Sequence, residues 1–319
     1  MAAHDLPVTL AQQSLLEFGV CLIGSVTVAT GGLAYFRRVR QDRPPIGTFN
    51  GRDIAVLLTL IVIVPFLYAV LPGWLLLCFL ILTFAASLSI GYRPVISAAP
   101  LWLGIGLLVG ANIWTSHTML GTVTGWRVWW IELDILVIAG AIAVANLYVQ
   151  GGMRLQHVAW FGLALAVYDV GSTLAVNVTA VLVEDFIGKP LDPTFGFRFG
   201  VNNYGIGIGD LLFYALFTVA ADKAYGRAAA RLMLSVTVVF GAAAPSLFPL
   251  VMRLIDFRND VLIPSQIFFA PAAFLCYLWM KHRYGPERTM AQYRAAVANA
   301  ADAAAADAQP APAPEPASV

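Results

Sequence analysis

Nine apolar runs, separated by short polar or charged turns, occupy most of this chain. Each run approaches the roughly 20 residues that a helix needs to cross the ~30 Å hydrocarbon layer of a membrane. Apolar residues make up 60% of the 319 residues and charged residues only 12%, which excludes an ordinary soluble globular domain. We therefore expect an all-α fold, a polytopic membrane bundle of about nine transmembrane helices. The predicted spans are Leu15–Phe36, Ile54–Leu71, Trp74–Ile90, Ala98–Trp114, Trp129–Val149, Val158–Val183, Gly205–Ala221, Ala229–Met252 and Ile263–Met280.

The basic residues predict how the chain is oriented in the membrane. With nine spans, 14 of the 19 Lys and Arg residues fall in one set of loops and 5 in the other. Since the loops rich in Lys and Arg face the cytoplasm, we expect the N-terminus outside and the C-terminus in the cytoplasm. The net charge of +1 indicates no nucleic-acid partner, so the lipid bilayer is the expected surrounding.

Two consecutive predicted spans each contain an aspartate. Asp169, in AVYDVGS, lies about 11 residues into its span, or roughly 16 Å at 1.5 Å per residue, near the middle of the bilayer. Asp210 follows three alternating glycines in VNNYGIGIGDLLF and leads into an apolar helix. An ionisable side chain within a span is costly and usually faces a bundle interior or a wet cavity. We therefore expect these two acids to form the functional site.

The two acids lie at different depths if both helices are regular. Asp169 is roughly 21 Å below the outer end of its span, whereas Asp210 is only about 10 Å below Asn203. They can meet if the sixth helix breaks near residues 177–179. They can also meet if Gly205–Gly209 runs extended at about 3.3 Å per residue and carries Asp210 deeper. Non-helical backbone at this depth is tolerated only where protein buries it or where it lines a water-filled cavity.

Two neighbouring features have more than one interpretation. Glu132 and Asp134 lie beside two tryptophans at the outer end of the fifth span, where acids are either interfacial or catalytic and the interfacial role is the more common. The segment TFGFRFG, residues 194–200, mixes aromatic residues with glycine between the sixth and seventh spans. It is either a substrate-facing lid or edge strand, or an interfacial loop anchored by its phenylalanines.

Two adjacent carboxyl groups favour a specific hydrolytic chemistry. Both cannot ionise together, so one keeps a proton while the other is charged. The charged group takes a proton from a water molecule, and the neutral group donates one to the carbonyl that the water attacks. This aspartic-protease chemistry needs no metal and no cofactor, and we expect neither. The motifs HExxH and GxSG, which indicate other protease chemistries, do not occur in the sequence.

The motifs around the two acids resemble those of a known family. Tyr168–Asp169 in one span and Gly207–Ile208–Gly209–Asp210 in the next are similar to the YD and GxGD motifs of the presenilin and signal peptide peptidase group of intramembrane aspartyl proteases. That family has a PAL motif at the start of its ninth helix. Here Pro264–Ser265–Gln266 opens the ninth predicted span and is the expected equivalent, whereas Pro245–Ser246–Leu247, closer in letters, lies in the eighth.

The resemblance implies a role for each of these residues. Asp169 and Asp210 would be catalytic, and the rest would support the site or bind substrate: Tyr168, Gly207, Ile208, Gly209, Pro264, Ser265 and Gln266. The implied substrates are single-span membrane proteins or signal peptides. The predicted orientation is that of signal peptide peptidases and opposite to presenilin, which implies substrates whose span has its N-terminus in the cytoplasm.

The same interpretation divides the chain into a bundle and a tail. Residues 1–294 would form the nine-span domain, with spans one to five as a scaffold and spans six to nine as the catalytic half. Residues 295–319, rich in Ala and Pro, would form a disordered cytoplasmic tail. Nothing in the sequence indicates an oligomer.

Other functions fit two membrane acids as well. A transporter or channel can use such a pair as a proton or cation relay beside unwound, glycine-rich helix starts. Prepilin peptidases also use two membrane aspartates, but these lie near the cytoplasmic ends of their helices, whereas Asp210 lies towards the outer end. A non-catalytic helical scaffold is the third alternative. No inverted repeat of the hydropathy pattern is evident, which favours the protease over the transporter.

Overall fold

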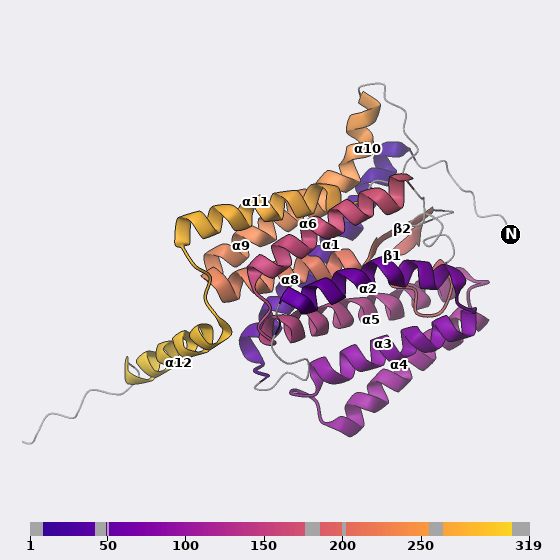
Figure 1. Cartoon of the computed structure of the whole chain (residues 1–319). Coiled ribbons are helices and arrows are strands. Elements are labelled where there is room, and N and C mark those ends of the chain that lie inside the picture. The colour runs from indigo at the N-terminus through magenta and orange to yellow at the C-terminus, as the bar shows by residue number, and fades with distance from the viewer. Residues whose placement is uncertain are drawn as a thin grey trace, which may run out of the picture.

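The computed structural model describes residues 9–41, 49, 51–175, 186–199, 202–254 and 264–307. Within these ranges the chain is mostly helical, and its strands form a single two-stranded hairpin (Figure 1). The predicted all-α class is confirmed for the bundle, and the hairpin is an addition to it.

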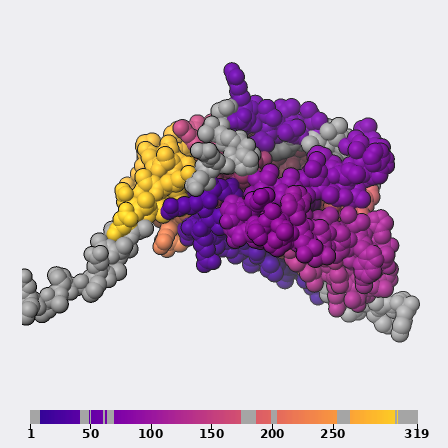
Figure 2. All heavy atoms as spheres, turned by 90° about the horizontal axis from the view of Figure 1, so that it is seen from below, coloured from indigo at the N-terminus to yellow at the C-terminus, as the bar shows by residue number. Residues whose placement is uncertain are grey.

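The first half of the chain follows the predicted spans closely. Its helices are α1 (Leu10–Arg38), α2 (Gly51–Val70), α3 (Gly73–Tyr92), α4 (Ala98–Thr118) and α5 (Val123–Gln150). Seen from below, α3 and α4 cover much of one face of the molecule (Figure 2). Trp102, Leu103 and Leu107 of α4 are each more than half exposed, as expected where lipid rather than water surrounds a helix.

The second half is more interrupted. Helix α6 (Leu155–Val170) continues as a π-helical segment, η1 (Gly171–Ala175). The strands β1 (Thr194–Phe199) and β2 (Asn202–Gly207) lead into α8 (Ile208–Tyr225). The remaining elements are α9 (Arg227–Val236), the π-helical segment η2 (Thr237–Ala243), α10 (Ala244–Leu254), α11 (Gln266–Tyr284) and α12 (Met290–Asp307).

Within the part of the chain that the structure describes, five helical stretches are long and apolar enough to cross a membrane. They are α1, α3, α4, α5 and the joined segment Arg227–Met252. A stretch of about 20 apolar residues is what a membrane span requires, so these stretches indicate a helical membrane protein.

Helix α8 occupies the centre of the bundle, where α1, α5, α6 and α9 contact it. Its Phe213, Tyr214 and Phe217 side chains are at most 2% exposed. Glycines bring its neighbours close: a Cβ added at Gly32 of α1 would lie 3.2 Å from Val219, and one at Gly162 of α6 would lie 3.3 Å from Phe217. Small residues allow such close approach of helices within membranes. The helix that begins with the GxGD aspartate is therefore held firmly along its length.

The interruption in the eighth predicted span lies directly before Pro245. The sequence predicts a kink at Pro245 and Pro249. The irregular segment η2 contains Gly241, whose carbonyl lies four residues before Pro245 and is crowded by its ring, whereas α10 continues through Pro249. Helix α10 leaves α9 at a steep angle beyond this segment (Figure 1). Wider π-helical turns accommodate a bend without exposing the whole backbone.

Helix α12 covers part of the segment expected to be a disordered tail. It extends to Asp307, because alanine, which dominates this stretch, is the best helix former. The Tyr293 ring lies 5.1 Å from that of Phe36, and an Arg294 guanidinium nitrogen donates to the carbonyl of Gln41 at 2.7 Å. The helix otherwise projects away from the bundle (Figure 1). Residues 308–319 lie outside the described part of the chain.

Candidate active site

Asp169 lies in the last turn of α6, directly before the π-helical segment η1. Such wide turns are frequent at functional sites. Two buried polar residues of η1, Ser172 and Thr173, follow it, and the Ser172 hydroxyl donates to the Asp169 carbonyl at 3.2 Å. Tyr168 packs partly buried against the core beside the acid. The predicted break near residues 177–179 lies outside the described residues.

Asp210 lies in the first turn of α8, whose N-cap is Gly207. Strand β2 keeps the backbone extended as far as Gly207, and the helix begins at Ile208. The expected extended glycine segment therefore exists, although it is two residues shorter than Gly205–Gly209. The partial positive charge at a helix N-terminus also favours an acid in this position.

The structure brings Asp169 and Asp210 together. Their carboxyl groups interact electrostatically, and the Tyr214 hydroxyl, one turn further along α8, interacts with both. Tyr214 donates a hydrogen bond of 3.0 Å to the carbonyl of Gly241 in η2. The two acids and the tyrosine hydroxyl thus form one interacting polar cluster inside the bundle.

The start of α11 completes the site. The Gln266 side-chain amide donates a hydrogen bond of 2.6 Å to a carboxyl oxygen of Asp210. Pro264 and Gln266 are buried, and Ser265 caps the helix. The predicted PAL-equivalent segment therefore reaches the GxGD acid. The Ser265 hydroxyl also lies beside Asp210 and Tyr214 and interacts with both, whereas the Gln266 side-chain oxygen has no hydrogen-bond partner among the described residues.

The glycines of the GxGD motif border open space. Gly207 and Gly209 are exposed, and a Cβ added at either would meet no described atom within 4 Å. Ile208, between them, points into the bundle, where its side chain lies 3.8 Å from the position that a Cβ of Gly140 would take. The two glycines thus leave room beside Asp210 that larger side chains would occupy.

Helix α1 contributes two residues that the sequence did not single out. The Cys21 thiol lies 3.7 Å from a Glu17 carboxyl oxygen, and the cysteine also interacts electrostatically with Asp210. Glu17 in turn accepts a hydrogen bond from the backbone of Gly205. The available signal was Glu17 itself, since an acid inside the first predicted span is as costly as those in the sixth and seventh.

The two acids of α5 form specific hydrogen bonds within the protein. Glu132 accepts from the Thr115 hydroxyl at 3.1 Å and from the Asn112 amide at 3.5 Å. Asp134 accepts from the backbone N–H of Gly196 in β1 at 2.8 Å. Both acids thus have partners within the protein, and the interfacial position that the sequence predicts for them stays a prediction.

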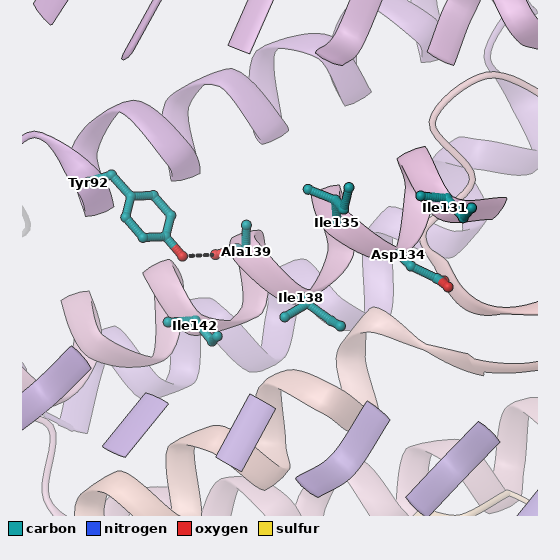
Figure 3. Close-up of a pocket in the computed structure, with 7 residues that line it drawn as sticks. All are labelled: Tyr92, Ile131, Asp134, Ile135, Ile138, Ala139 and Ile142. Carbon is teal, nitrogen blue, oxygen red and sulfur yellow. Dashed lines mark hydrogen bonds between the residues drawn. The ribbon is translucent and has the colours of Figure 1, made fainter. Parts of the chain in front are cut away.

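Asp134 also lies at one end of a shallow apolar groove (Figure 3). The groove has a volume of about 390 Å³. Its lining comes from α5 and from Tyr92 of α3, whose hydroxyl donates to the Ala139 carbonyl at 3.1 Å. The other lining residues are Ile131, Ile135, Ile138 and Ile142.

No cluster of three or more His, Cys, Asp and Glu side chains suited to a metal ion occurs within the described ranges. No protein-family model and no curated protein matches this chain, so its relation to other proteins rests on the motifs and geometry described above.

Proposed function

We propose that this protein is an intramembrane aspartyl protease, a presenilin-like bundle of nine spans that hydrolyses peptide bonds within transmembrane segments. One observation carries the proposal: acids from α6 and α8 lie near enough to interact electrostatically, and an amide from the start of α11 donates a hydrogen bond to one of them. These are the three elements that carry the YD, GxGD and PAL-equivalent motifs. The sequence separation of Asp169, Asp210 and Gln266 makes a chance meeting of all three improbable.

The chemistry follows from the unequal protonation of two close acids. The ionised carboxyl removes a proton from water as the oxygen forms a bond to the carbonyl carbon of the substrate. The neutral carboxyl donates its proton to the carbonyl oxygen, giving a tetrahedral diol. The protonated carboxyl then gives its proton to the amide nitrogen while the ionised one takes a proton from a diol hydroxyl, so that the C–N bond breaks, the new carboxyl product forms and the pair returns to its starting state. The Gln266 amide, as a donor to Asp210, fixes the orientation of that carboxyl group.

Two features support substrate binding beside the acids. The exposed glycines at positions 207 and 209 leave open space next to Asp210. The Gln266 side-chain oxygen, which has no hydrogen-bond partner among the described residues, offers a hydrogen bond to the backbone of an unwound peptide. A buried polar atom is costly without a partner, and a bound substrate backbone supplies one.

The proposed substrates are single-span membrane proteins or signal peptides. The distribution of Lys and Arg supports an N-terminus outside and a C-terminus in the cytoplasm, the orientation of signal peptide peptidases. A reporter fused to the C-terminus and found outside the cell would contradict this orientation and the substrate class that follows from it.

A second candidate is a transporter or channel that uses the Asp pair as a proton or cation relay. The observation in its favour is the irregular backbone beside both acids, π-helical after Asp169 and extended before Asp210. Interrupted helices of this kind also coordinate ions in transporters.

Cleavage of reporter proteins distinguishes the two candidates. The purified wild type, Asp169→Ala and Asp210→Ala would be incubated with single-span reporters in both orientations. Asp302→Ala, which changes an exposed acid of α12, is the matched control. Cleavage by the wild type and the control, lost in both site variants, supports the protease. Inert protein throughout, combined with ion flux in proteoliposomes that needs both acids, supports the relay.

A further inference from the structure

The hairpin that precedes Asp210 is tightly packed at one pair of glycines. In the antiparallel register Gly196 of β1 lies opposite Gly205 of β2. A Cβ added at Gly196 would overlap the carbonyl oxygen of Tyr204, and one added at Gly205 would lie 2.6 Å from the Thr194 methyl group. The two backbones therefore approach each other more closely here than side chains would permit.

Each outer edge of the hairpin meets a carboxyl group at this glycine pair. Asp134 of α5 accepts from the N–H of Gly196 at 2.8 Å, so this N–H points away from β2. In an antiparallel ladder, opposed residues turn their polar groups to the same side of the pairing, both inward or both outward. The N–H of Gly205 must then point away from β1, and Glu17 of α1 accepts a hydrogen bond from it there.

The hairpin transmits its position directly to Asp210. Strand β2 ends at Gly207, which is also the N-cap of α8, so no loop separates the strand from the first turn that holds the acid. The N–H of Ile208 donates to the carbonyl of Pro193 at 2.8 Å, which ties the start of α8 to the start of β1. A shift of the hairpin along α1 or α5 would therefore move Asp210.

Neither carboxyl group is explained by charge pairing. Among the described residues, neither Glu17 nor Asp134 has a basic side chain as an ion-pair partner. A carboxyl group inside a span is costly, so a fold gains little from keeping one merely to hold two strands that already pair with each other. The cost is understandable if the exact placement of the hairpin matters to the chemistry.

We propose that Glu17 and Asp134 are positioning residues, which clamp the hairpin at Gly196 and Gly205 and thereby align Asp210 with Asp169. This inference rests on the proposed protease function. Neither side chain touches the reacting atoms, so each acts through the backbone of the hairpin. The clamp also gives the scaffold half of the chain, through α1 and α5, a direct part in catalysis.

The test compares variants that keep or remove the acceptor oxygen. Asp134→Asn and Glu17→Gln retain a side-chain carbonyl that accepts the glycine N–H, whereas Asp134→Val and Glu17→Val retain none. Glu132→Val, which removes an acid two residues from Asp134 that bonds to α4 and not to the hairpin, is the matched control. Thermal unfolding in detergent micelles verifies that each variant is folded.

Two measurements are made on every variant. Amide hydrogen exchange over residues 194–207 measures, without any substrate, how readily the hairpin opens. Reporter cleavage gives kcat and KM separately. We expect each valine variant to accelerate exchange by about tenfold or more, because the hydrogen bond from the glycine N–H is lost. We expect kcat to fall by a similar factor, about tenfold, with KM nearly unchanged, and the amide variants to restore both.

Several outcomes overturn the inference. Unchanged exchange and unchanged kcat in Asp134→Val, with an active wild type, would overturn the clamp alone. Loss of kcat in Asp134→Asn with normal exchange would show that the charge matters and the hydrogen bond does not. An equal loss in Glu132→Val would show a general packing defect. A wild type inert towards every reporter would overturn the protease proposal and this one together.

Discussion

The two ends of α8 each carry an aspartate, and the protein surrounds them differently. Near the C-terminal end, the Asp222 carboxylate accepts two hydrogen bonds from the Arg37 guanidinium, at 2.7 and 3.1 Å. Near the N-terminal end, Asp210 accepts a hydrogen bond from the neutral amide of Gln266 and faces a second acid. A neutralised charge serves the fold, whereas a carboxyl group without a counter-ion keeps the proton chemistry that hydrolysis requires.

The two ends of α8 also differ in how many contacts other elements make with them. At the C-terminal end, the Lys223 ammonium group donates to the carbonyl of Met153, and Arg288 donates to the carbonyl of Asp222 at 3.0 Å. At the N-terminal end, Gly209 is exposed and borders open space. One end is closed by contacts from several elements, and the other is left accessible.

The largest expected effect is on activity at the open end. Asp210→Asn removes the acid but not its volume, and we expect cleavage to fall by about 10³-fold, as when a general acid or base is lost. The melting temperature in micelles should not fall, because no ion pair of Asp210 is broken. A variant that cleaved at the wild-type rate would contradict the assignment of the chemistry to the N-terminal end of α8.

A third buried acid, Asp192 in the loop before β1, should make the stability of the protein depend on pH. Burial raises its pKa from 3.8 to about 6, because the charged form loses its water. The folded protein therefore binds this proton more tightly than the unfolded chain does. The resulting stabilisation is complete below the unfolded pKa and is lost as the pH rises through about 6.

Asp192→Asn should therefore gain stability over the wild type as the pH rises. From pH 4 to pH 7 we expect the difference in the free energy of unfolding to grow by up to about 3 kcal/mol. Chemical unfolding in micelles at the two pH values measures it. Asp302→Asn, on exposed α12, is the control and should show no such trend. Parallel pH profiles for Asp192→Asn and the wild type would refute the assignment.

Substitution of Asp222, at the C-terminal end of α8, should lower the stability of the protein rather than its activity. Asp222→Ala leaves Arg37 without its partner, and because the Arg37 side chain is 37% exposed we expect a loss of only about 2 kcal/mol. Cleavage per folded molecule should stay close to that of the wild type. Adding Arg37→Ala should recover part of the loss, as a double-mutant cycle would show. A tenfold fall in kcat would instead link this end to the chemistry.

The smallest expected effect on stability is at the GxGD glycine. Gly209→Ala should change the free energy of unfolding by less than about 0.5 kcal/mol, because its methyl group meets no described atom. The KM for reporters should rise, because that methyl group occupies the space beside Asp210. Gly241→Ala is the matched contrast: its Cβ would lie 2.8 Å from the Tyr214 ring, so we expect a loss of about 1–3 kcal/mol.

The sequence predicted the helices well and their interruptions poorly. Hydropathy alone located every described helix from α1 to α11, because length and apolar content decide whether a segment can span a membrane. It did not decide between strand and loop for residues 194–200, since phenylalanine and glycine suit both. It also predicted kinks at both Pro245 and Pro249, whereas the one irregular segment of this span, η2, lies before Pro245 and α10 continues through Pro249.

The sequence predicted the residues of the candidate site but not the residues that contact the hairpin beside it. Asp169, Asp210 and Gln266 carried motif or depth signals, and the structure brings them together. Glu17 and Asp134 act through backbone groups of a hairpin far away in sequence. Pairing of that kind depends on strand register, which single-residue patterns do not reveal.

The hydrogen bond from Arg288 to Asp222 has a consequence for biosynthesis. A chain is made from its N-terminus, so α8 is synthesised before Arg288. The carbonyl of Asp222 accepts from the N–H of Gly226 at 2.9 Å within the same segment, whereas the hydrogen bonds from Arg288 to Asp222 and Ala224, at 3.0 and 3.1 Å, can form only later. The C-terminal end of α8 is thus completed by a segment that is synthesised after it.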